Sequence, residues 1–306
     1  IGTMASFALH GAGLIDLTRT FYIAAPTTLL ATLVGSVIFG LGMSLTGTCG
    51  FGTLARIGGG DLKSIVTFLV MGITAYATMR GAGAYLRLGL GVPARTGEPE
   101  DAGFAFVIER MTGLSATAAG LMIAALLAVF CLSSHAFRHS GRLLLTAVMV
   151  GLTIAFGWYA TGVLAADPFE PYPLESFTFS APLGEAIIYV MTMTGASLKF
   201  GIGAVAGVII GAAATTLVQR HFRWEACDDA REMRRQMLGG MLMGFGGVTA
   251  YGCTVGQGLT AASALAYSAP LALLGIYAGA WIGLHALVHG SVIEPLKQFW
   301  PSANRP

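Results

Sequence analysis

Charged side chains are scarce in this chain of 306 residues. Only 10% of the residues are Asp, Glu, Lys or Arg, whereas a soluble domain has about 25%. Two long runs, 20–55 and 236–293, contain no Asp, Glu, Lys or Arg, and only His285 and His289 interrupt the second. Because a bilayer core takes about 20 apolar residues per helix, each run is long enough for one or two crossings. Together with a mean hydropathy of +0.73, this excludes an ordinary soluble domain and predicts an integral membrane protein.

A strong net charge is also absent, since the formal charge at neutral pH is only +2. No basic cluster with interleaved aromatic side chains occurs, so we expect no nucleic-acid partner. The four cysteines, Cys49, Cys131, Cys227 and Cys253, form no CxxC pair and have no histidine at zinc-finger spacing. We therefore expect no closed metal site and no cofactor.

The first residues, "IGTMASFALHGAGL", show no secretory signal. They lack a basic segment that is followed by a long apolar core and a small-residue cleavage site, so we expect no signal peptide here. The chain begins at Ile rather than Met. Whether a segment precedes it therefore stays open.

Apolar segments of sufficient length predict seven membrane helices. Three shorter apolar pieces, near 50–58, 184–195 and 255–265, cannot cross a bilayer alone, so we expect half-helices or re-entrant segments. The predicted fold class is all-α, a polytopic protein that forms a single integral membrane domain over residues 1–306. The predicted membrane helices are 21–46, 62–80, 114–133, 143–164, 199–219, 236–250 and 269–289.

Charges in the connections predict the orientation in the bilayer. The loop 135–142 carries two arginines and no acid, and the loop 220–235 carries five arginines among four acids. The Pro-rich segment 166–185 has four acids and no base. By the positive-inside rule, the two basic loops face the cytoplasm and the acidic segment faces outside. The connection 81–113 is then expected to be external as well.

An internal repeat is the most informative pattern in the sequence. A shift of 204 positions places Cys49 on Cys253 and aligns "GSVIFGLGMSLTGTCGFG" (35–52) with "GGMLMGFGGVTAYGCTVG" (239–256). Four glycines of the first segment fall on glycines of the second. Both segments also share an order, namely a glycine-spaced apolar helix, a break beside the cysteine and a short helix.

The shared order indicates a duplication, although a chain with 43 glycines produces chance glycine matches easily. We interpret the repeat as two related halves, at approximately 20–140 and 142–290. Their short or broken helices are expected to meet at a central constriction. Two such halves bring Cys49 and Cys253 near one axis.

Glycines on both sides of each cysteine indicate interrupted helices. Glycines farther upstream are explained by close helix packing, but "TGTCGFG" and "YGCTVGQG" place glycines around a single polar atom. Broken backbone at membrane depth survives only where protein or a water-filled cavity satisfies its N–H and C=O groups. We therefore expect Cys49 and Cys253 to line a cavity, in which the helix starts that follow them attract anions.

Neutral groups are expected to bind the ligand in this cavity. A buried arginine would hold a dianion too firmly for release, whereas thiols and hydroxyls give several weak contacts. Thiols are also polarizable, which suits a ligand that presents sulfur. The predicted binding residues, none of them catalytic, are Cys49, Cys253, Gly50, Thr48, Gly252, Thr254 and Gln257.

Other candidate residues have plainer interpretations. Cys131, in the apolar "LLAVFCLSS", is predicted to be a small buried apolar residue. Cys227, in a polar segment, is predicted to be a loop residue without a role in permeation. His285 and His289 have the spacing of a two-histidine metal site, but no glutamate follows at the required position, so we expect interfacial histidines. Lys199 either attracts anions to a vestibule or snorkels to the interface, and the second is the commoner behaviour.

Three stretches resemble the YeeE/YedE family of sulfur-compound transporters, which includes thiosulfate uptake proteins. They are "GLGMSLTGTCGFGTLARIGGGD", "LESFTFSAPLGE" and "GGMLMGFGGVTAYGCTVGQGLTAASALA", and the likeness extends over most of the chain. The resemblance implies a multi-helix protein of the inner (cell) membrane in which Cys49 and Cys253 contact thiosulfate in passing. Family members often carry a further cysteine in a Phe-Cys pair near the N-terminus. Here Ala8 follows Phe7, which argues against a three-cysteine relay and leaves room for a different sulfur substrate.

Three functions stay open at this point. The leading one is a transporter that imports thiosulfate or a related sulfur compound through a cysteine-lined pathway. The second is a membrane sulfur-transfer or redox protein whose cysteines form covalent sulfur intermediates, because thiols at helix starts are reactive. The third is a non-catalytic subunit that docks a small cytosolic sulfur-carrier protein through 220–235, a partner that the family resemblance implies.

Overall fold

The chain is almost entirely helical in the computed structural model. The structure describes residues 1–24, 29–90, 102–165, 173–226 and 229–289. Within these ranges the only extended pairings are isolated bridges, so the predicted all-α class is confirmed. The chain divides into two compact units: unit 1 consists of Ile1–Leu29, Val92–Thr178 and Val255–Leu271, and unit 2 of Leu30–Gly91, Phe179–Thr254 and Ala272–Pro306.

Six helical segments of the described residues are long and apolar enough to cross a membrane. They coincide with six of the seven predicted helices, which makes the chain a multi-pass membrane protein. The first of them begins at Leu29, because residues 25–28 of the predicted helix 21–46 lie outside the described residues. The six segments are Leu29–Gly59, Leu62–Arg80, Ala116–Ser133, Gly141–Leu164, Phe200–Val218 and Ser268–His289.

The seventh predicted helix is present but starts earlier than the apolar run. Helix α13 spans Ala230–Thr249, whereas the prediction began at Gln236. Its first turns carry Arg231, Glu232 and two further arginines. Charges of this kind place the start of a helix in water or in the headgroup layer, where hydropathy does not detect it.

The short apolar pieces are also helical. Helix α4 spans Gly50–Gly59, helix α11 spans Ala181–Thr192, and a π-helical segment spans Gly256–Ala261. The further helical segments of the described residues are α2 (Phe21–Ala24), α6 (Gly83–Leu90), α7 (Phe104–Thr112), α9 (His135–His139), the 3-10 turn Leu17–Arg19 and the π-helical segment Ala160–Leu164.

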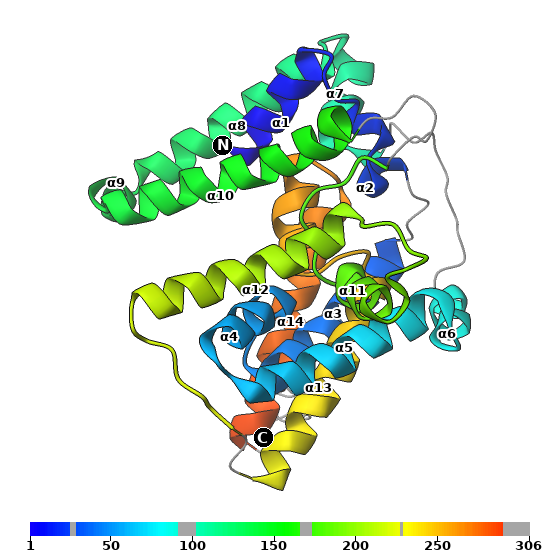
Figure 1. Cartoon of the computed structure of the whole chain (residues 1–306). Coiled ribbons are helices and arrows are strands. Elements are labelled where there is room, and N and C mark those ends of the chain that lie inside the picture. The colour runs from blue at the N-terminus through cyan, green and yellow to red at the C-terminus, as the bar shows by residue number, and fades with distance from the viewer. Residues whose placement is uncertain (25–28, 91–101, 166–172, 227–228, 290–306) are drawn as a thin grey trace, which may run out of the picture. The chain divides into compact units, whose positions relative to one another are not determined.

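Unit 1 is organised around three helices. Helix α1 (Gly2–Gly11) packs against α8 (Ala116–Ser133) and α10 (Gly141–Tyr159), as Figure 1 shows. Phe7 of α1 is fully buried, and its ring occupies the space that a side chain at Gly120 of α8 would need. The core extends to the end of α10.

The segment 255–271 belongs to the same core as α10. The indole Nε1 of Trp158, a fully buried residue, donates a hydrogen bond to Ser263 Oγ at 3.0 Å. The hydroxyl of Thr260 donates to the Phe177 carbonyl oxygen at 2.6 Å. The residues that follow the second cysteine are therefore fixed within unit 1.

Two helices of unit 2, α3 (Leu29–Thr46) and α13, run antiparallel and touch through glycines (Figure 1). Gly35, early in α3, lies against Gly246, late in α13, and Gly42 lies against Gly239. A Cβ on Gly42 would stand 2.6 Å from the Gly239 carbonyl oxygen. The two backbones therefore approach as closely as they do only because both positions lack side chains.

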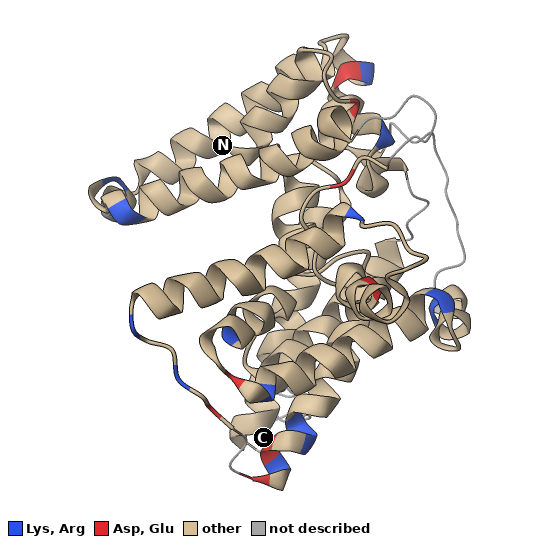
Figure 2. Cartoon of the chain, viewed as in Figure 1, with Lys and Arg blue, Asp and Glu red and all other residues tan. Residues whose placement is uncertain are grey.

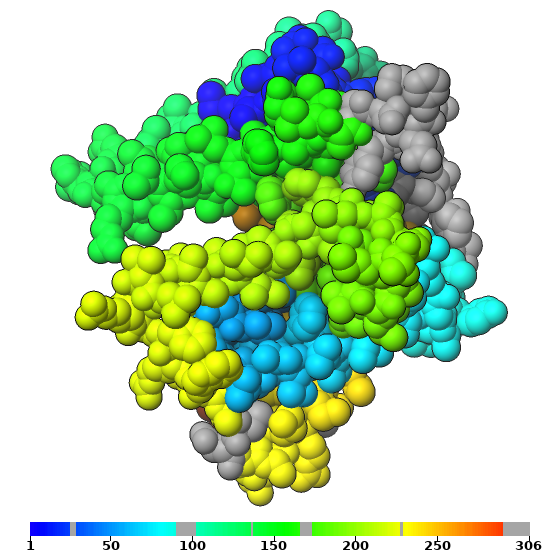
Figure 3. All heavy atoms as spheres, in the orientation of Figure 1, coloured from blue at the N-terminus to red at the C-terminus, as the bar shows by residue number. Residues whose placement is uncertain are grey.

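Glycines also lie at other helix–helix contacts of unit 2. Gly244 of α13 lies against α5 (Leu62–Arg80), and Gly40 of α3 lies against α14 (Ser268–His289). Figure 3 shows α12 (Phe200–Val218) lying on α4. At this contact a Cβ on Gly58 would stand 2.7 Å from the Ile209 carbonyl oxygen. Tight packing of small residues thus holds the half-helix α4 against a membrane-spanning helix.

Most charged side chains of unit 2 lie at one end, around the start of α13 and the segment that follows α12 (Figure 2). Here Lys63 Nζ pairs with Glu232 Oε1 at 3.2 Å. The backbones of Asp61 and Glu225 form an isolated β-bridge at the same end. This end contains part of the basic loop 220–235, which the positive-inside rule assigns to the cytoplasm.

Candidate functional site

Cys49 lies at the end of a tight turn between α3 and α4. α3 ends at Thr46, and Gly47 takes a left-handed φ of 72° that redirects the chain. The Thr46 hydroxyl donates to the Thr48 carbonyl oxygen at 2.9 Å. The Cys49 carbonyl oxygen accepts hydrogen bonds from the amide and the hydroxyl of Thr53, at 2.9 and 3.0 Å. Cys49 is therefore held directly before the first turn of α4.

The Cys49 thiol is half-buried and does not cap α4. The backbone at Cys49 is extended, and within the described residues the side chain makes no capping hydrogen bond. A Cβ on Gly52 would overlap Thr48 Oγ1 and stand 4.0 Å from Cys49 Sγ, so glycine at this position makes room for the Thr48 hydroxyl beside the thiol. The first N–H groups of a helix have no partner inside it. The first N–H groups of α4 thus lie beside the Cys49 thiol, Thr48 and Gly52.

Cys253 follows a similar turn at the end of α13. α13 ends at Thr249, and Tyr251 takes a left-handed φ of 59°. The Gly252 N–H then donates to the Gly247 carbonyl oxygen at 2.9 Å. Cys253 is fully buried, with an exposed fraction of 0%.

The two cysteine segments share their backbone states. Gly47 and Tyr251, each two residues before a cysteine, both have left-handed φ angles. A helix begins at Gly50 in the first segment and at Thr254 in the second. A left-handed conformation costs a residue with a Cβ about 1–2 kcal/mol, so the turn at Tyr251 is imposed by its surroundings. The breaks predicted beside both cysteines are present.

The residues before and at the start of α11 contact both the Cys49 turn and the last turns of α13. The Phe179 carbonyl oxygen lies 3.3 Å from where a Cβ on Gly50 would stand, and the rings of Phe179 and Phe51 have centroids 5.4 Å apart. The next residue, Ser180, has its Oγ 2.7 Å from where a Cβ on Gly247 would stand. The start of α11 therefore lies between the Cys49 turn and the last turns of α13.

Ser180 and Thr254 each bury a hydroxyl oxygen that has no hydrogen-bond partner among the described residues. Ser180 is only 2% exposed and does not cap α11 with its side chain. A buried hydroxyl without a hydrogen bond costs about 1–3 kcal/mol of folding free energy. Each of these hydroxyls is therefore expected to bind a water or a ligand oxygen. Sequence analysis did not name Ser180; the available signal was Ser-Ala-Pro, which is typical of a helix start.

The structure divides the predicted binding residues between the two units. Gln257 belongs to unit 1, where it is fully buried and its Oε1 accepts a hydrogen bond from Ser268 at 3.0 Å. Its contact with a ligand stays a prediction. The predicted residues that lie in unit 2 are Thr48, Cys49, Gly50, Gly252, Cys253 and Thr254.

The prediction for Cys131 was wrong. This residue is exposed on α8 rather than buried. Its neighbour Phe130 is 77% exposed, and Leu126, one turn earlier, is 66% exposed. An apolar membrane helix presents such side chains to lipid, which a soluble-protein rule for cysteine does not anticipate.

The other candidate residues have local partners or lie outside the described residues. Lys199 Nζ pairs with Glu185 Oε1 at 2.9 Å, so its charge is matched locally. The rings of His285 and His289 have centroids 5.8 Å apart on α14. Cys227 and residues 166–172 of the acidic segment lie outside the described residues.

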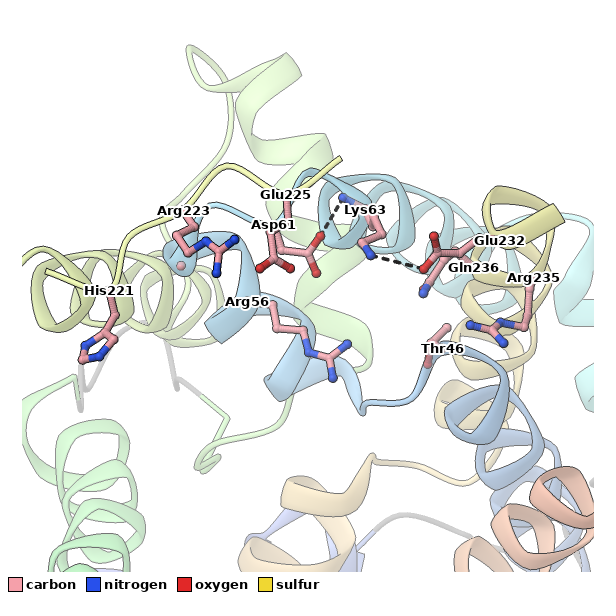
Figure 4. Close-up of a pocket in the computed structure, with 11 residues that line it drawn as sticks. Thr46, Arg56, Asp61, Lys63, His221, Arg223, Glu225, Glu232, Arg235 and Gln236 are labelled. Atoms are coloured by element: carbon pink, nitrogen blue, oxygen red, sulfur yellow. Dashed lines mark hydrogen bonds and ion pairs between the residues drawn. The ribbon is translucent and has the colours of Figure 1, made fainter. Parts of the chain in front are cut away.

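A charged pocket of about 480 Å³ opens at the charged end of unit 2 (Figure 4). It lies beside the Cys49 turn, because the Arg56 guanidinium donates to the Gly47 carbonyl oxygen at 3.3 Å. The pocket is lined by Thr46, Arg56, Gly59, Asp61, Lys63, His221, Arg223, Glu225, Glu232, Arg235 and Gln236.

Comparison with known sequences identifies the class of this membrane protein. The sequence pattern of the sulphur transport family matches residues 1–282. The chain therefore belongs to this family, which confirms the resemblance to YeeE/YedE proteins that its cysteine motifs carry.

Two curated relatives are similar to this chain over most of their length. Thiosulfate transporter TsuA of Spirochaeta thermophila is 26% identical over 268 residues, which cover 84% of this chain and 78% of the relative. Thiosulfate transporter TsuA of Escherichia coli is 26% identical over 305 residues, which cover 92% of this chain and 80% of the relative.

Proposed function

We propose that this protein imports thiosulfate or a closely related sulfur anion past the thiols of Cys49 and Cys253. The observation that carries the proposal is the placement of each thiol directly before a helix start, after a turn with a left-handed residue. Membership of the sulphur transport family and the printed names of the two relatives support a sulfur anion as the substrate.

The electrostatics of the two segments favour weak, reversible binding. Residues 46–54 and 247–256 contain no charged side chain. The attraction for an anion therefore comes from helix starts, each of which carries about half a positive charge. A thiol, a hydroxyl and a few N–H groups bind an anion more loosely than a buried arginine, which a transported ligand requires in order to leave.

Contacts between α3 and α13 support two related halves. Under the shift that places Cys49 on Cys253, Gly35 corresponds to Gly239 and Gly42 to Gly246. Gly35 lies against Gly246, and Gly42 lies against Gly239, so each glycine meets the counterpart of the other. A two-fold axis produces such reciprocal contacts. Because the two helices are antiparallel, we infer an axis in the membrane plane and hence inverted repeats.

We place the protein in the inner (cell) membrane, with the charged end of unit 2 toward the cytoplasm. The basic loop 220–235 supports this orientation through the positive-inside rule. A small cytosolic sulfur-carrier protein would then meet the protein at this loop and take the sulfur compound as it leaves.

Uptake measurements on cysteine variants test the proposal. In a host that depends on external thiosulfate, Cys49→Ala and Cys253→Ala should each abolish uptake, because each removes a contact on the pathway. Cys131→Ala is the matched control, since this thiol is exposed on α8, and it should retain nearly full uptake. Undiminished uptake in both Cys49→Ala and Cys253→Ala would end the proposal.

Sulfur transfer is a second candidate function, because thiols at helix starts are the reactive kind. A cysteine thiolate would attack the sulfane sulfur of thiosulfate, form a persulfide and release sulfite. Mass measurement of the purified protein after incubation with thiosulfate separates the two functions. A stable gain of one sulfur atom on Cys49 or Cys253 favours transfer, whereas an unchanged mass favours passage.

A further inference from the structure

The charged pocket of unit 2 presents arginines that face one another. Figure 4 shows Arg56, from α4, and Arg235, from α13, extending toward each other with Thr46 between them. Two guanidinium groups repel each other across such a gap unless an anion lies between them. The gap adjoins the turn that holds Cys49, since Arg56 also donates to the carbonyl oxygen of Gly47.

Four basic side chains and three carboxylates line the pocket, and two of the carboxylates, Asp61 and Glu232, contact Lys63 and Ser64 rather than an arginine. Glu232 pairs with Lys63 at 3.2 Å. Asp61 accepts hydrogen bonds from the Lys63 N–H at 2.9 Å and from the Ser64 hydroxyl at 2.8 Å. No carboxylate lies within ion-pair distance of Arg56, Arg223 or Arg235 in the described part of the chain.

A neutral donor adds to the positive side chains. Gln236 is 7% exposed and lines the pocket. Its Oε1 accepts a hydrogen bond from the Thr67 hydroxyl at 2.9 Å, which leaves the amide nitrogen as a donor. Guanidinium forks and amide N–H groups are the donors that tetrahedral oxyanions prefer.

We propose that this pocket binds a tetrahedral oxyanion, and that its natural occupant is the sulfonate end of the transported sulfur anion after it has passed Cys49. The inference rests on the proposed function. An anion that leaves a neutral constriction enters a site of positive charge, so return toward Cys49 is disfavoured. Because Arg56 and Arg235 are exposed residues, binding is weak, reversible and weakened by salt.

Anion-dependent thermal unfolding of the purified protein in a neutral detergent tests the site directly. The probes are thiosulfate, sulfate and inorganic phosphate, each of which should raise the midpoint because a bound ligand stabilises the folded state. Arg56→Gln and Arg235→Gln should each raise the half-saturating concentration about fivefold or more, since a charged hydrogen-bond donor is lost. Arg234→Gln is the matched control, because Arg234 adjoins Arg235 on α13 but does not line the pocket, and it should bind as the wild type does.

Wild-type affinity for all three anions in both Arg56→Gln and Arg235→Gln would overturn the proposal. The measurement is repeated with the double variant Cys49→Ala, Cys253→Ala, in which the pocket should keep its affinity. The pocket is thereby tested apart from the transport pathway. If wild-type proteoliposomes take up no sulfur anion, the proposed function fails, while this binding result still decides whether the pocket is an oxyanion site.

A lipid phosphate offers the same chemistry, so a further arm separates the two sources. Thermal unfolding is measured in micelles with and without phosphatidylglycerol. The arginine variants should show the same weakened response to soluble anions in both kinds of micelle. If they lose only the response to phosphatidylglycerol, the pocket is a headgroup site and the proposal is wrong.

Discussion

The shape of the Cys49 turn depends on the absence of a side chain at Gly52. Thr48 and Cys49 are the last two residues before α4. Gly52, one turn later, has no side chain, and the Thr48 hydroxyl occupies the space that a Cβ there would need. The amide and the hydroxyl of Thr53 both donate to the Cys49 carbonyl oxygen and fix this turn. The position of the thiol therefore depends on Gly52 and Thr53, which are not among the predicted binding residues.

Gly52→Ala is predicted to reduce uptake several-fold while it changes the free energy of unfolding by less than about 1 kcal/mol. The new methyl group overlaps Thr48 Oγ1, but a threonine side chain can rotate away, and alanine is the better helix former. Initial uptake rates and denaturant unfolding check the two parts. The control is Gly207→Ala on α12, where nothing lies within 4 Å of the new Cβ. Wild-type uptake by Gly52→Ala would show that the shape of this corner does not matter.

At the level of elements, the contact between α3 and α13 holds the two cysteine segments in place. Each helix ends in one of the two turns, and the backbones of the helices approach closely at their glycines. In a membrane no hydrophobic force draws helices together, so their association depends on this close packing. A shift of either helix would move the cysteine that follows it.

Gly42→Ala is predicted to destabilise the protein by about 1–3 kcal/mol, the usual cost of overpacking. Its Cβ would stand 2.6 Å from the Gly239 carbonyl oxygen and 2.7 Å from the Met243 nitrogen, and backbone atoms cannot move aside as a side chain can. Denaturant unfolding in detergent measures the change. Gly211→Ala on α12, with nothing within 4 Å of the new Cβ, should be neutral or stabilising. Equal stability of the two variants would contradict the packing described for α3 and α13.

Most helices could be predicted from the sequence, because apolar segments of 18 to 31 residues are long enough to cross a membrane. The breaks at Cys49 and Cys253 could be predicted too, since glycines beside a polar atom weaken a helix in lipid. The start of α13 at Ala230 could not, because its charged first turns carry no apolar signal.

Tertiary contacts explain the parts of the site that sequence analysis missed. Ser180 lies beside Gly247, and Arg235 shares a pocket with Arg56, although each pair is far apart in the sequence. No local pattern encodes such a meeting. Gln257 was grouped with the cysteines because it follows Cys253 closely, but the chain passes from unit 2 to unit 1 between them.

For the whole molecule, the charge pattern predicts a fixed orientation that α12 can report. A cysteine that replaces Ser197, before α12, should react with an impermeant maleimide in intact cells. A cysteine that replaces Gln219, after α12, should react only once the membrane is opened, because the basic loop 220–235 faces the cytoplasm. Both variants are made in a Cys131→Ala, Cys227→Ala background, since Cys131 is exposed and Cys227 belongs to the same polar loop 220–235. The reverse labelling pattern would show that the orientation is inverted.

Transport of labelled thiosulfate into proteoliposomes tests most directly whether a sulfur anion passes the two thiols intact. One sample is labelled at the sulfane sulfur and another at the sulfonate sulfur. Both labels should enter at the same initial rate with the wild-type protein, and neither should enter with Cys49→Ala or Cys253→Ala. Entry of the sulfane label alone, or full entry of both labels without either thiol, would contradict the account.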